Sequence, residues 1–160
     1  MFVLVYEPEK KIVDKAQTLF KKVKNLNFTS DVNIATRSKV DILYLGSVLQ
    51  CILNIDNFLK IIKKINPKEI VIYDLLACKN PTFFSYQNFY GKKMLVKFYN
   101  LNFLIKKFKK NGFELKFISN IQEILGKIQP PSMNNFKKMY KINYSKQIIL
   151  KNTRWIYQYV

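Results

Sequence analysis

Three apolar runs, separated by segments with helical periodicity, constrain the fold of this chain most strongly. The runs span residues 2–6, 40–45 and 69–77. Each is continuously apolar or nearly so, which is typical of strands buried on both faces of a parallel sheet. A short further strand is expected at residues 26–28. This alternation predicts an α/β fold with a mostly parallel sheet and helices on both faces.

The first helix is expected directly after the first strand. Glu7 ends the strand, and Pro8 suits the first position of a helix. Apolar residues then recur on one side of the segment, with lysines opposite, at Ile12, Val13, Ala16, Leu19, Phe20 and Val23. This spacing predicts an amphipathic helix. A second helix is expected to start at Asp56 as its N-cap and to end before Pro67.

The second half of the chain has a weaker pattern. Residues 78–100 are rich in aromatic side chains without a clear period, which predicts a long functional loop. A helix is expected at residues 102–112, strands at 113–119 and 139–152, and a loop with two prolines between them. Because no crossover helix precedes the last strand, the final pair is predicted to be antiparallel. No repeat or linker interrupts residues 1–160, so a single domain is expected.

Composition excludes several classes of protein. The chain is 49% hydrophobic, which excludes a disordered protein. No apolar run reaches the roughly 18 residues of a membrane span, and no signal peptide is recognisable, so a cytoplasmic protein is expected. Cys51 and Cys78 form no CxxC motif and are interpreted as buried, reduced thiols. The chain has no histidine, so neither a metal site nor a Ser-His or Cys-His pair is expected.

The charge of the chain is strongly positive. The net charge is +18, and 28 residues are basic, but only Arg37 and Arg154 are arginines. Proteins that read nucleic-acid sequence usually use arginine at base edges. We therefore interpret the positive charge mainly as a drift in composition toward lysine, of the kind that an AT-rich genome produces. The lysines would then lie on solvated faces. Attraction to anionic substrates, membranes or nucleic acid stays open as the alternative.

Candidate site residues follow the predicted strands. In open α/β sheets, ligands bind beyond the carboxyl ends of the strands. Glu7 lies at the first such end, residues 46–50 at the second and Asp74 at the third. An acid after a strand of this kind often accepts hydrogen bonds from ribose hydroxyls, but Glu7 equally suits the first turn of a helix. Residues 46–50 also fit an ordinary strand–helix turn, and Asp74 fits a solvated loop residue.

The same segments resemble a known family. The stretches "LVYEPEKKIVDKAQTLF", "DILYLGSVLQCILNIDNFL", "IVIYDLLACKNPTFFSYQNFYGKKMLVKFYNLNFLIKKFKKNGFEL" and "NNFKKMYKINYSKQIILKN" cover nearly the whole chain. They resemble the Rossmann-like, class I S-adenosylmethionine-dependent methyltransferases. They are most similar to the methyltransferases that are often encoded with bacterial surface-polysaccharide genes. "SVLQ" and "PTFFSYQNFYG" are the more specific pieces of the resemblance.

The resemblance implies a role for each candidate residue. S-adenosylmethionine would be the cofactor, with Glu7 as the ribose-binding acid. The cofactor loop would consist of Gly46, Ser47, Val48, Leu49 and Gln50. Asp74 would be the catalytic residue. The substrate side would carry Tyr86, Gln87, Asn88 and Tyr90. The resemblance also implies a sugar-type methyl acceptor.

The resemblance also implies a missing part. The first strand and the glycine-rich cofactor loop of the family would lie before Met1, and the four glycines of this chain form no GxG motif. An N-terminally truncated methyltransferase is therefore expected. Its flanking strands would pair directly, or a complementing chain or homo-oligomer would supply the strand, or the protein would be an inactive remnant. A non-catalytic assembly module is the first alternative function. A nucleic-acid binder using "LIKKFKKNGFELK" is the less favoured one.

Overall fold

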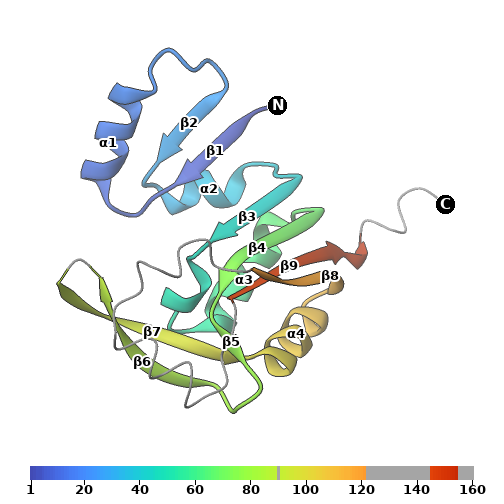
Figure 1. The fold of residues 1–160 in the computed structure, drawn as a ribbon. Coiled ribbons are helices and arrows are strands. Elements are labelled where there is room, and N and C mark those ends of the chain that lie inside the picture. Colours follow the sequence, from blue (N-terminus) through green and yellow to red (C-terminus); the bar gives the residue numbers. More distant parts are fainter. Residues whose placement is uncertain (90, 122–144, 155–160) are drawn as a thin grey trace.

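The computed structural model describes residues 1–89, 91–121 and 145–154 (Figure 1). Strands and helices alternate through the first half of the chain, and strands dominate the second half. The strands are β1 (Val3–Tyr6), β2 (Leu26–Thr29), β3 (Ile42–Gly46), β4 (Glu69–Leu75), β5 (Ala77–Cys78), β6 (Phe83–Phe89), β7 (Lys92–Asn100), β8 (Phe113–Ile121) and β9 (Ser145–Asn152). The helices are α1 (Lys10–Leu19), α2 (Val32–Arg37), α3 (Ile55–Ile65), α4 (Leu101–Lys110) and the 3-10 helix η1 (Leu49–Cys51).

The main sheet has four strands in the order β3-β4-β9-β8. β3 and β4 are parallel, with Ile42 opposite Glu69. β9 runs antiparallel to both β4 and β8. This arrangement confirms the predicted α/β fold with a parallel part and a C-terminal antiparallel pair. The main hydrophobic core includes buried side chains of β3, β4 and β9 and of the helices α3 and α4.

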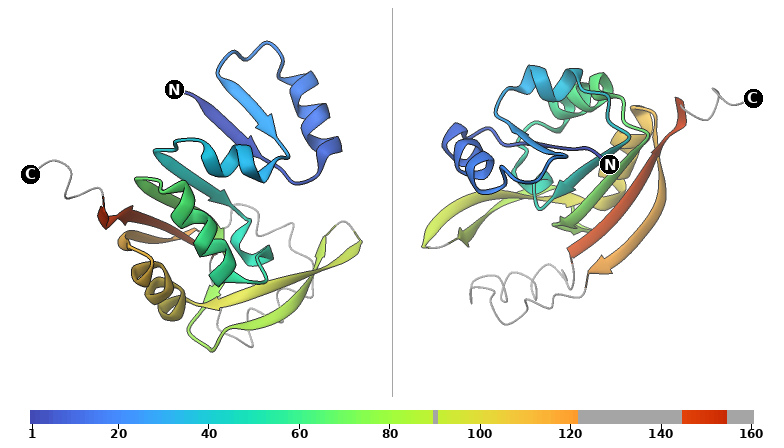
Figure 2. Two further views of the ribbon diagram at one scale, coloured as in Figure 1. Left: turned by 180° about the vertical axis from the view of Figure 1, so that it is seen from behind. Right: turned by 90° about the horizontal axis from the view of Figure 1, so that it is seen from above.

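A second, two-stranded sheet contains the N-terminal strands. β1 and β2 are parallel, with Val3 opposite Leu26, and α1 connects them. In Figures 1 and 2, β1 lies between β2 and β3 and points in the same direction as β3. Within the part of the chain that the structure describes, β1 pairs only with β2, and β3 pairs only with β4. The two sheets are therefore adjacent without a shared hydrogen-bond ladder.

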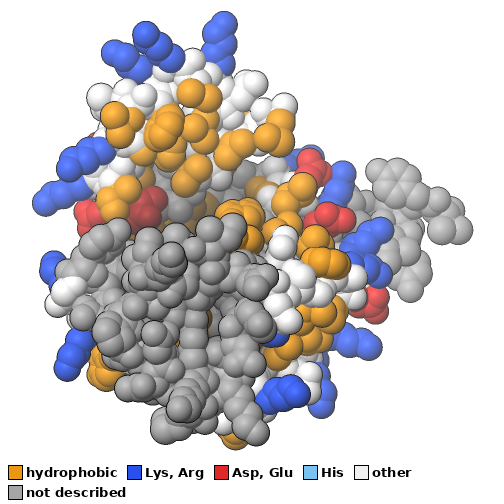
Figure 3. All heavy atoms as spheres, viewed as in Figure 1, with side chains coloured by type: hydrophobic (Ala, Val, Ile, Leu, Met, Phe, Trp, Pro, Cys, Tyr) orange, Lys and Arg blue, Asp and Glu red, His pale blue; other side chains and the backbone are white. Residues whose placement is uncertain are grey.

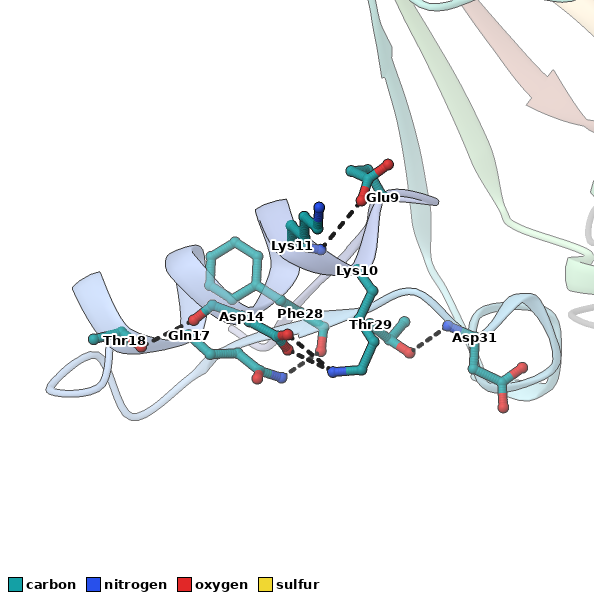
Figure 4. Close-up of polar contacts among 9 residues, drawn as sticks. All are labelled: Glu9, Lys10, Lys11, Asp14, Gln17, Thr18, Phe28, Thr29 and Asp31. Carbon is teal, nitrogen blue, oxygen red and sulfur yellow. Dashed lines mark hydrogen bonds and ion pairs between the residues drawn. The ribbon is translucent and has the colours of Figure 1, made fainter.

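The predicted start of the first helix is wrong by two residues. Pro8 lies outside α1, because Glu9 is its N-cap and accepts a hydrogen bond from the Lys11 N–H at 3.4 Å. Figure 4 shows how α1 is fixed to β2: the Gln17 amide donates to the Phe28 carbonyl at 3.1 Å. Lys10 and Asp14 form an ion pair at 2.8 Å on the exposed side of the same helix.

The helix α2 was not predicted, and the predicted cap of α3 is wrong. Asp31 caps α2 by accepting from the Asn33 N–H at 2.7 Å. Asn54 caps α3 by accepting from the Asn57 N–H at 3.0 Å, so Asp56 lies inside the first turn. There Asp56 forms an ion pair with Lys107 of α4 at 2.6 Å. An acid in a first turn is favourable to the helix dipole even when it caps nothing.

The predicted long loop after the third apolar run is wrong. Residues 83–100 form mainly the antiparallel hairpin of β6 and β7, with Phe83 opposite Phe98. These two rings stack with their centroids 5.0 Å apart. Gly91 in the turn has a φ of +77°, which glycine adopts without steric cost. Aromatic residues occur on both faces of the hairpin and conceal the period of two expected for a strand.

Two further expectations concern single features. Cys78 is buried as predicted, but Cys51 is exposed. It ends the one-turn helix η1, whose Leu49 and Gln50 side chains take the buried positions instead. Among the helices that the structure describes, none is long and apolar enough to cross a membrane.

Candidate functional site

The winding of the chain locates a candidate site between β1 and β3. From β1 the chain continues to β2, away from β3, whereas from β3 it continues to β4, away from β1. Right-handed crossovers in opposite directions place their helices on opposite faces, and Figure 2 shows α1 and α3 on opposite faces. Ligands of open α/β sheets bind at such a reversal, beyond the carboxyl ends of the strands. The residues that follow β1, β3 and β4 therefore form the candidate site.

Ser47 and Asp74 meet at this edge. Ser47 follows β3 directly, and Asp74 lies near the end of β4. The Ser47 hydroxyl donates to Asp74 Oδ2 at 2.6 Å, and the Ser47 N–H donates to the Tyr73 carbonyl at 2.9 Å. Ser47 is exposed and Asp74 is half-buried. The predicted second and third strand ends are thus joined by one hydrogen bond between side chains.

Both residues have a left-handed backbone. The φ of Ser47 is +52°, and that of Asp74 is +56°. Such a conformation costs a residue other than glycine about 1–2 kcal/mol. At Asp74 it coincides with a bulge, because the pairing of β4 with β9 shifts between Ile72 and Leu75. Bulges and strained residues of this kind concentrate next to functional sites.

Gly46 lies against the ring of Tyr44. A Cβ at position 46 would lie 2.7 Å from Tyr44 Cε1, which is closer than van der Waals contact allows. The tyrosine ring therefore covers the end of β3 on the face opposite Leu45, which is buried in the core. The missing side chain of Gly46 leaves room for the Tyr44 ring in this position.

The side chains that follow Ser47 become buried within two residues. Val48 is exposed, whereas Leu49 and Gln50 are buried, with 1% and 6% of their surface accessible. Gln50 Oε1 has no hydrogen-bond partner among the described residues. A buried amide oxygen without a partner is costly, so it marks a position where a donor is needed.

Two residues of β7 hold this loop, and the sequence did not indicate them. The Tyr99 hydroxyl donates to the Ile52 carbonyl at 3.0 Å, and the Lys97 ammonium donates to the Leu53 carbonyl at 3.0 Å. Burial raises the pKa of Tyr99 to about 12, and Cys51 adds to the shift. Burial lowers the pKa of Lys97, and the nearby Asp56 opposes that change. Residues 94–99 contain one lysine among apolar and aromatic residues and show no alternation, so the sequence carried no signal for the roles of Lys97 and Tyr99.

Glu7 lies at the carboxyl end of β1, as predicted. The helix begins three residues later, so the interpretation of Glu7 as a first-turn helix charge is wrong. Its Oε1 accepts from the Glu9 N–H at 3.0 Å, and its own N–H donates to the Thr29 carbonyl at 3.0 Å. No hydrogen bond among the described residues joins Glu7 to Ser47 or Asp74. A carboxylate accepts several hydrogen bonds, so its other oxygen keeps acceptor capacity.

The four predicted substrate residues belong to the hairpin region. Tyr86, Gln87 and Asn88 lie in β6, and two-thirds of the Tyr86 side chain is exposed. Tyr90 lies outside the described residues. No hydrogen bond among the described side chains joins Tyr86 or Gln87 to the Ser47–Asp74 pair, and the side chain of Asn88 lies outside the described part of the structure. Their role on the substrate side therefore stays a prediction.

Comparison with known proteins identifies the fold. No family model matches the chain, and neither does any curated protein sequence. Among solved structures, it is similar to a protein from Listeria monocytogenes described as an S-adenosylmethionine-dependent methyltransferase. The two share 14% identity and a TM-score of 0.64, over 94% of this chain and 79% of the other. An S-adenosylmethionine-dependent methyltransferase from Mesorhizobium loti shares 8% identity and a TM-score of 0.61, over 94% and 80%.

A third structure contains bound ligands. It is 1,6-didemethyltoxoflavin-N1-methyltransferase from Burkholderia thailandensis, with 1,6-didemethyltoxoflavin and S-adenosylhomocysteine. It shares 10% identity and a TM-score of 0.60, over 94% of this chain and 61% of the other. At these identities the similarity concerns the fold. The chain has the fold of the Rossmann-like methyltransferases.

Proposed function

We propose that this chain forms part of an S-adenosylmethionine-dependent methyltransferase whose site lies at the carboxyl ends of β1, β3 and β4. One observation carries the proposal. Ser47 and Asp74 are held in left-handed conformations and hydrogen-bonded to each other at the point where the winding of the sheet reverses. Two strained polar residues at that point indicate a ligand site rather than ordinary turns. The shared fold of the solved methyltransferases supports the choice of cofactor.

The residues of the site suit parts of this cofactor. Glu7 would accept from the two ribose hydroxyls, because its carboxylate has acceptor capacity beyond its bond with the Glu9 N–H. Gln50 Oε1 would accept from a ligand donor, since it is buried without a partner among the described residues. The carboxylate of Asp74 suits the neighbourhood of a positively charged sulfonium. The bound cofactor would supply an electrophilic methyl group.

Asp74 would act as the base for a hydroxyl acceptor. Its Oδ2 accepts from Ser47, so the hydroxyl of Ser47 fixes the orientation of the carboxylate. Its other oxygen would take the proton of the acceptor hydroxyl while the new O–CH3 bond forms. In our proposal the acceptor is a sugar hydroxyl, and Tyr86, Gln87, Asn88 and Tyr90 would contact it. Aromatic and amide side chains are suited to the faces and hydroxyls of sugars.

Calorimetry with S-adenosylhomocysteine tests the cofactor. We expect binding by the full chain and roughly tenfold weaker binding by Glu7→Gln, because a hydrogen bond to a charged group is worth about 1.5–3 kcal/mol. Glu114→Gln is the matched control, since Glu114 lies beside Lys116 on β8, at the edge of the main sheet opposite β3. Its affinity should equal that of the wild type. No heat at millimolar ligand with folded protein would remove the proposed cofactor.

A second assay tests the reaction. The release of S-adenosylhomocysteine is measured with nucleotide sugars as acceptors. Asp74→Asn should keep the hydrogen bond from Ser47 and the cofactor affinity but should lose most of the turnover, because an amide takes up no proton. Full turnover by Asp74→Asn would show that Asp74 is not the base.

A non-catalytic assembly module is the second candidate. The observation that favours it is the pair of strand edges at β1 and β3, which have no partner in the part of the chain that the structure describes. An unpaired edge is a ready site for another polypeptide. This candidate predicts a stable complex and no binding of S-adenosylhomocysteine, so the same calorimetry separates the two functions.

A further inference from the structure

The end of helix α1 carries apolar side chains on the surface of the protein. Of the apolar stripe predicted for this helix, Val13 is buried. By contrast, Leu19 has 78% of its surface accessible, Phe20 has 47% and Val23 has 48%. Phe20 stacks on Phe28 of β2 with the ring centroids 5.8 Å apart, and this contact fixes the position of its exposed part. A single exposed apolar residue is ordinary, whereas a group of them indicates an interaction site.

Lysines lie between and beside these apolar side chains. Residues 19–24 have the sequence LFKKVK, which contains no acidic residue. Lys21, Lys22 and Lys24 are all exposed. Among the described residues, none of the three forms an ion pair. Their charge is therefore available to an anionic partner, and we call residues 19–24 the basic apolar tip.

The basic apolar tip protrudes from one end of the molecule (Figure 1). Two successive turns form it, because the Val23 N–H donates to the Phe20 carbonyl at 2.8 Å and the Leu26 N–H to the Val23 carbonyl at 3.3 Å. Figure 3, in the same view, shows basic side chains at the top of the molecule with hydrophobic side chains directly below them. Each partner in a stable protein interface contributes roughly 20–30 residues, far more than this tip contains. A small protrusion suits a flat, deformable surface better than it suits another protein.

We propose that the basic apolar tip docks the protein on the surface of an anionic lipid bilayer. Lysine suits this partner, because attraction to anionic headgroups depends on charge and not on the fork with which arginine reads base edges. The apolar side chains enter the boundary between headgroups and acyl chains, while the lysines stay at the level of the headgroups. The net charge of +18 adds long-range attraction to the same surface.

The tip and the candidate site lie at opposite ends of the strands. β1 and β2 are parallel, with Val3 opposite Leu26, and the Val3 N–H donates to the Asn25 carbonyl at 2.8 Å. Residues 19–24 therefore lie near the amino ends of these strands, whereas Glu7 follows the carboxyl end of β1. A protein docked through the tip keeps its candidate site open toward the solution. The docking proposal therefore does not rest on the proposed cofactor.

Co-sedimentation of the full chain with lipid vesicles tests the proposal. The probes are vesicles of phosphatidylcholine alone and vesicles of an equal mixture of phosphatidylcholine and phosphatidylserine. We expect the mixed vesicles to bind the protein about tenfold or more tightly than phosphatidylcholine alone, because their surface is anionic. This binding should weaken as the salt concentration rises, since salt screens the attraction.

Two double variants separate the tip from the general charge of the chain. Lys21→Gln with Lys22→Gln should lower the partition coefficient on mixed vesicles by roughly fivefold per lysine. The matched control is Lys109→Gln with Lys110→Gln, which removes the same charge from the last turn of α4. The neighbouring Phe108 is buried, so no apolar side chain there would hold these lysines at the lipid surface. The control should therefore lower the partition coefficient by less than about twofold.

Leu19→Ser separates the apolar contact from the charge. It keeps every charge of the chain, and Leu19 is so exposed that the fold does not depend on it. We expect about threefold weaker binding to mixed vesicles, because less apolar surface leaves the water. Wild-type binding by Leu19→Ser would overturn the proposal, since charge alone would then account for the attraction.

Three other outcomes would also overturn it. The folded protein would fail to bind mixed vesicles at low salt. The two double variants would lose equal affinity, which means that the charge of the whole surface acts and not the tip. The tip would bind polyuridine, with loss of that binding in the Lys21, Lys22 variant, while the protein bound no vesicles, which means that the tip is a nucleic-acid surface.

Discussion

The left-handed backbone at Ser47 gives a prediction whose magnitude follows from the structure. At a φ of +52° an alanine or serine carries a cost of about 1–2 kcal/mol that glycine does not. Glycine loses about 0.5–1 kcal/mol more backbone entropy on folding. Ser47→Gly and Ser47→Ala both lose the hydrogen bond to Asp74, so their difference isolates the strain. Ser47→Gly should therefore be more stable than Ser47→Ala by about 1 kcal/mol.

Urea unfolding of the two variants measures this difference from the transition midpoints at an unchanged m-value. Ser85 is the matched control, because it lies in the extended strand β6, opposite Val96. There the order should reverse, with Ser85→Ala more stable than Ser85→Gly by about 0.5–1 kcal/mol. If alanine is at least as stable as glycine at position 47, the backbone of Ser47 is not left-handed and the argument for a strained site fails.

Two further perturbations test other parts of the structure. Tyr99 has a folded-state pKa of about 12 against 10.0 for the free side chain, so its phenol stabilises the fold fully below pH 10 and loses that contribution as the pH rises toward 12. Measured by urea unfolding, the free energy of unfolding of the wild type should fall by about 2–3 kcal/mol between pH 10 and pH 12, and that of Tyr99→Phe should not. The same pH dependence in both proteins would contradict the raised pKa. Asn152 is fully buried, and its amide donates to Asn66 Oδ1 and to the Pro67 carbonyl at 2.9 and 2.8 Å. Asn152→Leu should lower the free energy of unfolding by about 2–4 kcal/mol in the same assay, because it leaves buried groups without partners, and a loss below about 1 kcal/mol would contradict that role.

The strands of the parallel part were predictable for a simple physical reason. Their continuous apolar runs located them, but the expectation that they are buried on both faces is wrong. Burial alternates along β4, where Ile70 and Ile72 are buried and Tyr73 is 40% exposed. The helix α3 was predictable because its apolar residues repeat with a helical period. The antiparallel end followed from the absence of a crossover helix in the sequence before β9. These signals depend on burial, which a single sequence records well.

The errors concern features that depend on competition between neighbours. Glu9 and Asn54 cap their helices, whereas Pro8 had been predicted as the first helical residue and Asp56 as an N-cap. Several residues near each start can accept from the free N–H groups, so the sequence does not single out one of them. The helix α2 is too short to show a period. The hairpin was missed because aromatic residues occupy both of its faces.

The candidate site was predictable in position and not in geometry. The rule that ligands bind beyond the carboxyl ends of strands selects Glu7, Ser47 and Asp74 from the sequence. The hydrogen bond between Ser47 and Asp74, and their left-handed backbones, depend on the bulge in β4. A bulge is set by the pairing of β4 with β9, about seventy residues later in the chain. A distant pairing of this kind leaves no local pattern in the sequence.

Chemical-shift mapping with S-adenosylhomocysteine tests the central claim most directly. The account predicts that amide shifts gather at the carboxyl ends of the strands, at Glu7, residues 46–50 and Asp74. The amides at the opposite ends of the same strands, at Val3, Ile42 and Glu69, should shift little. Binding without shifts at the carboxyl ends, or shifts that gather on the lysine-rich helix α4 instead, would contradict it.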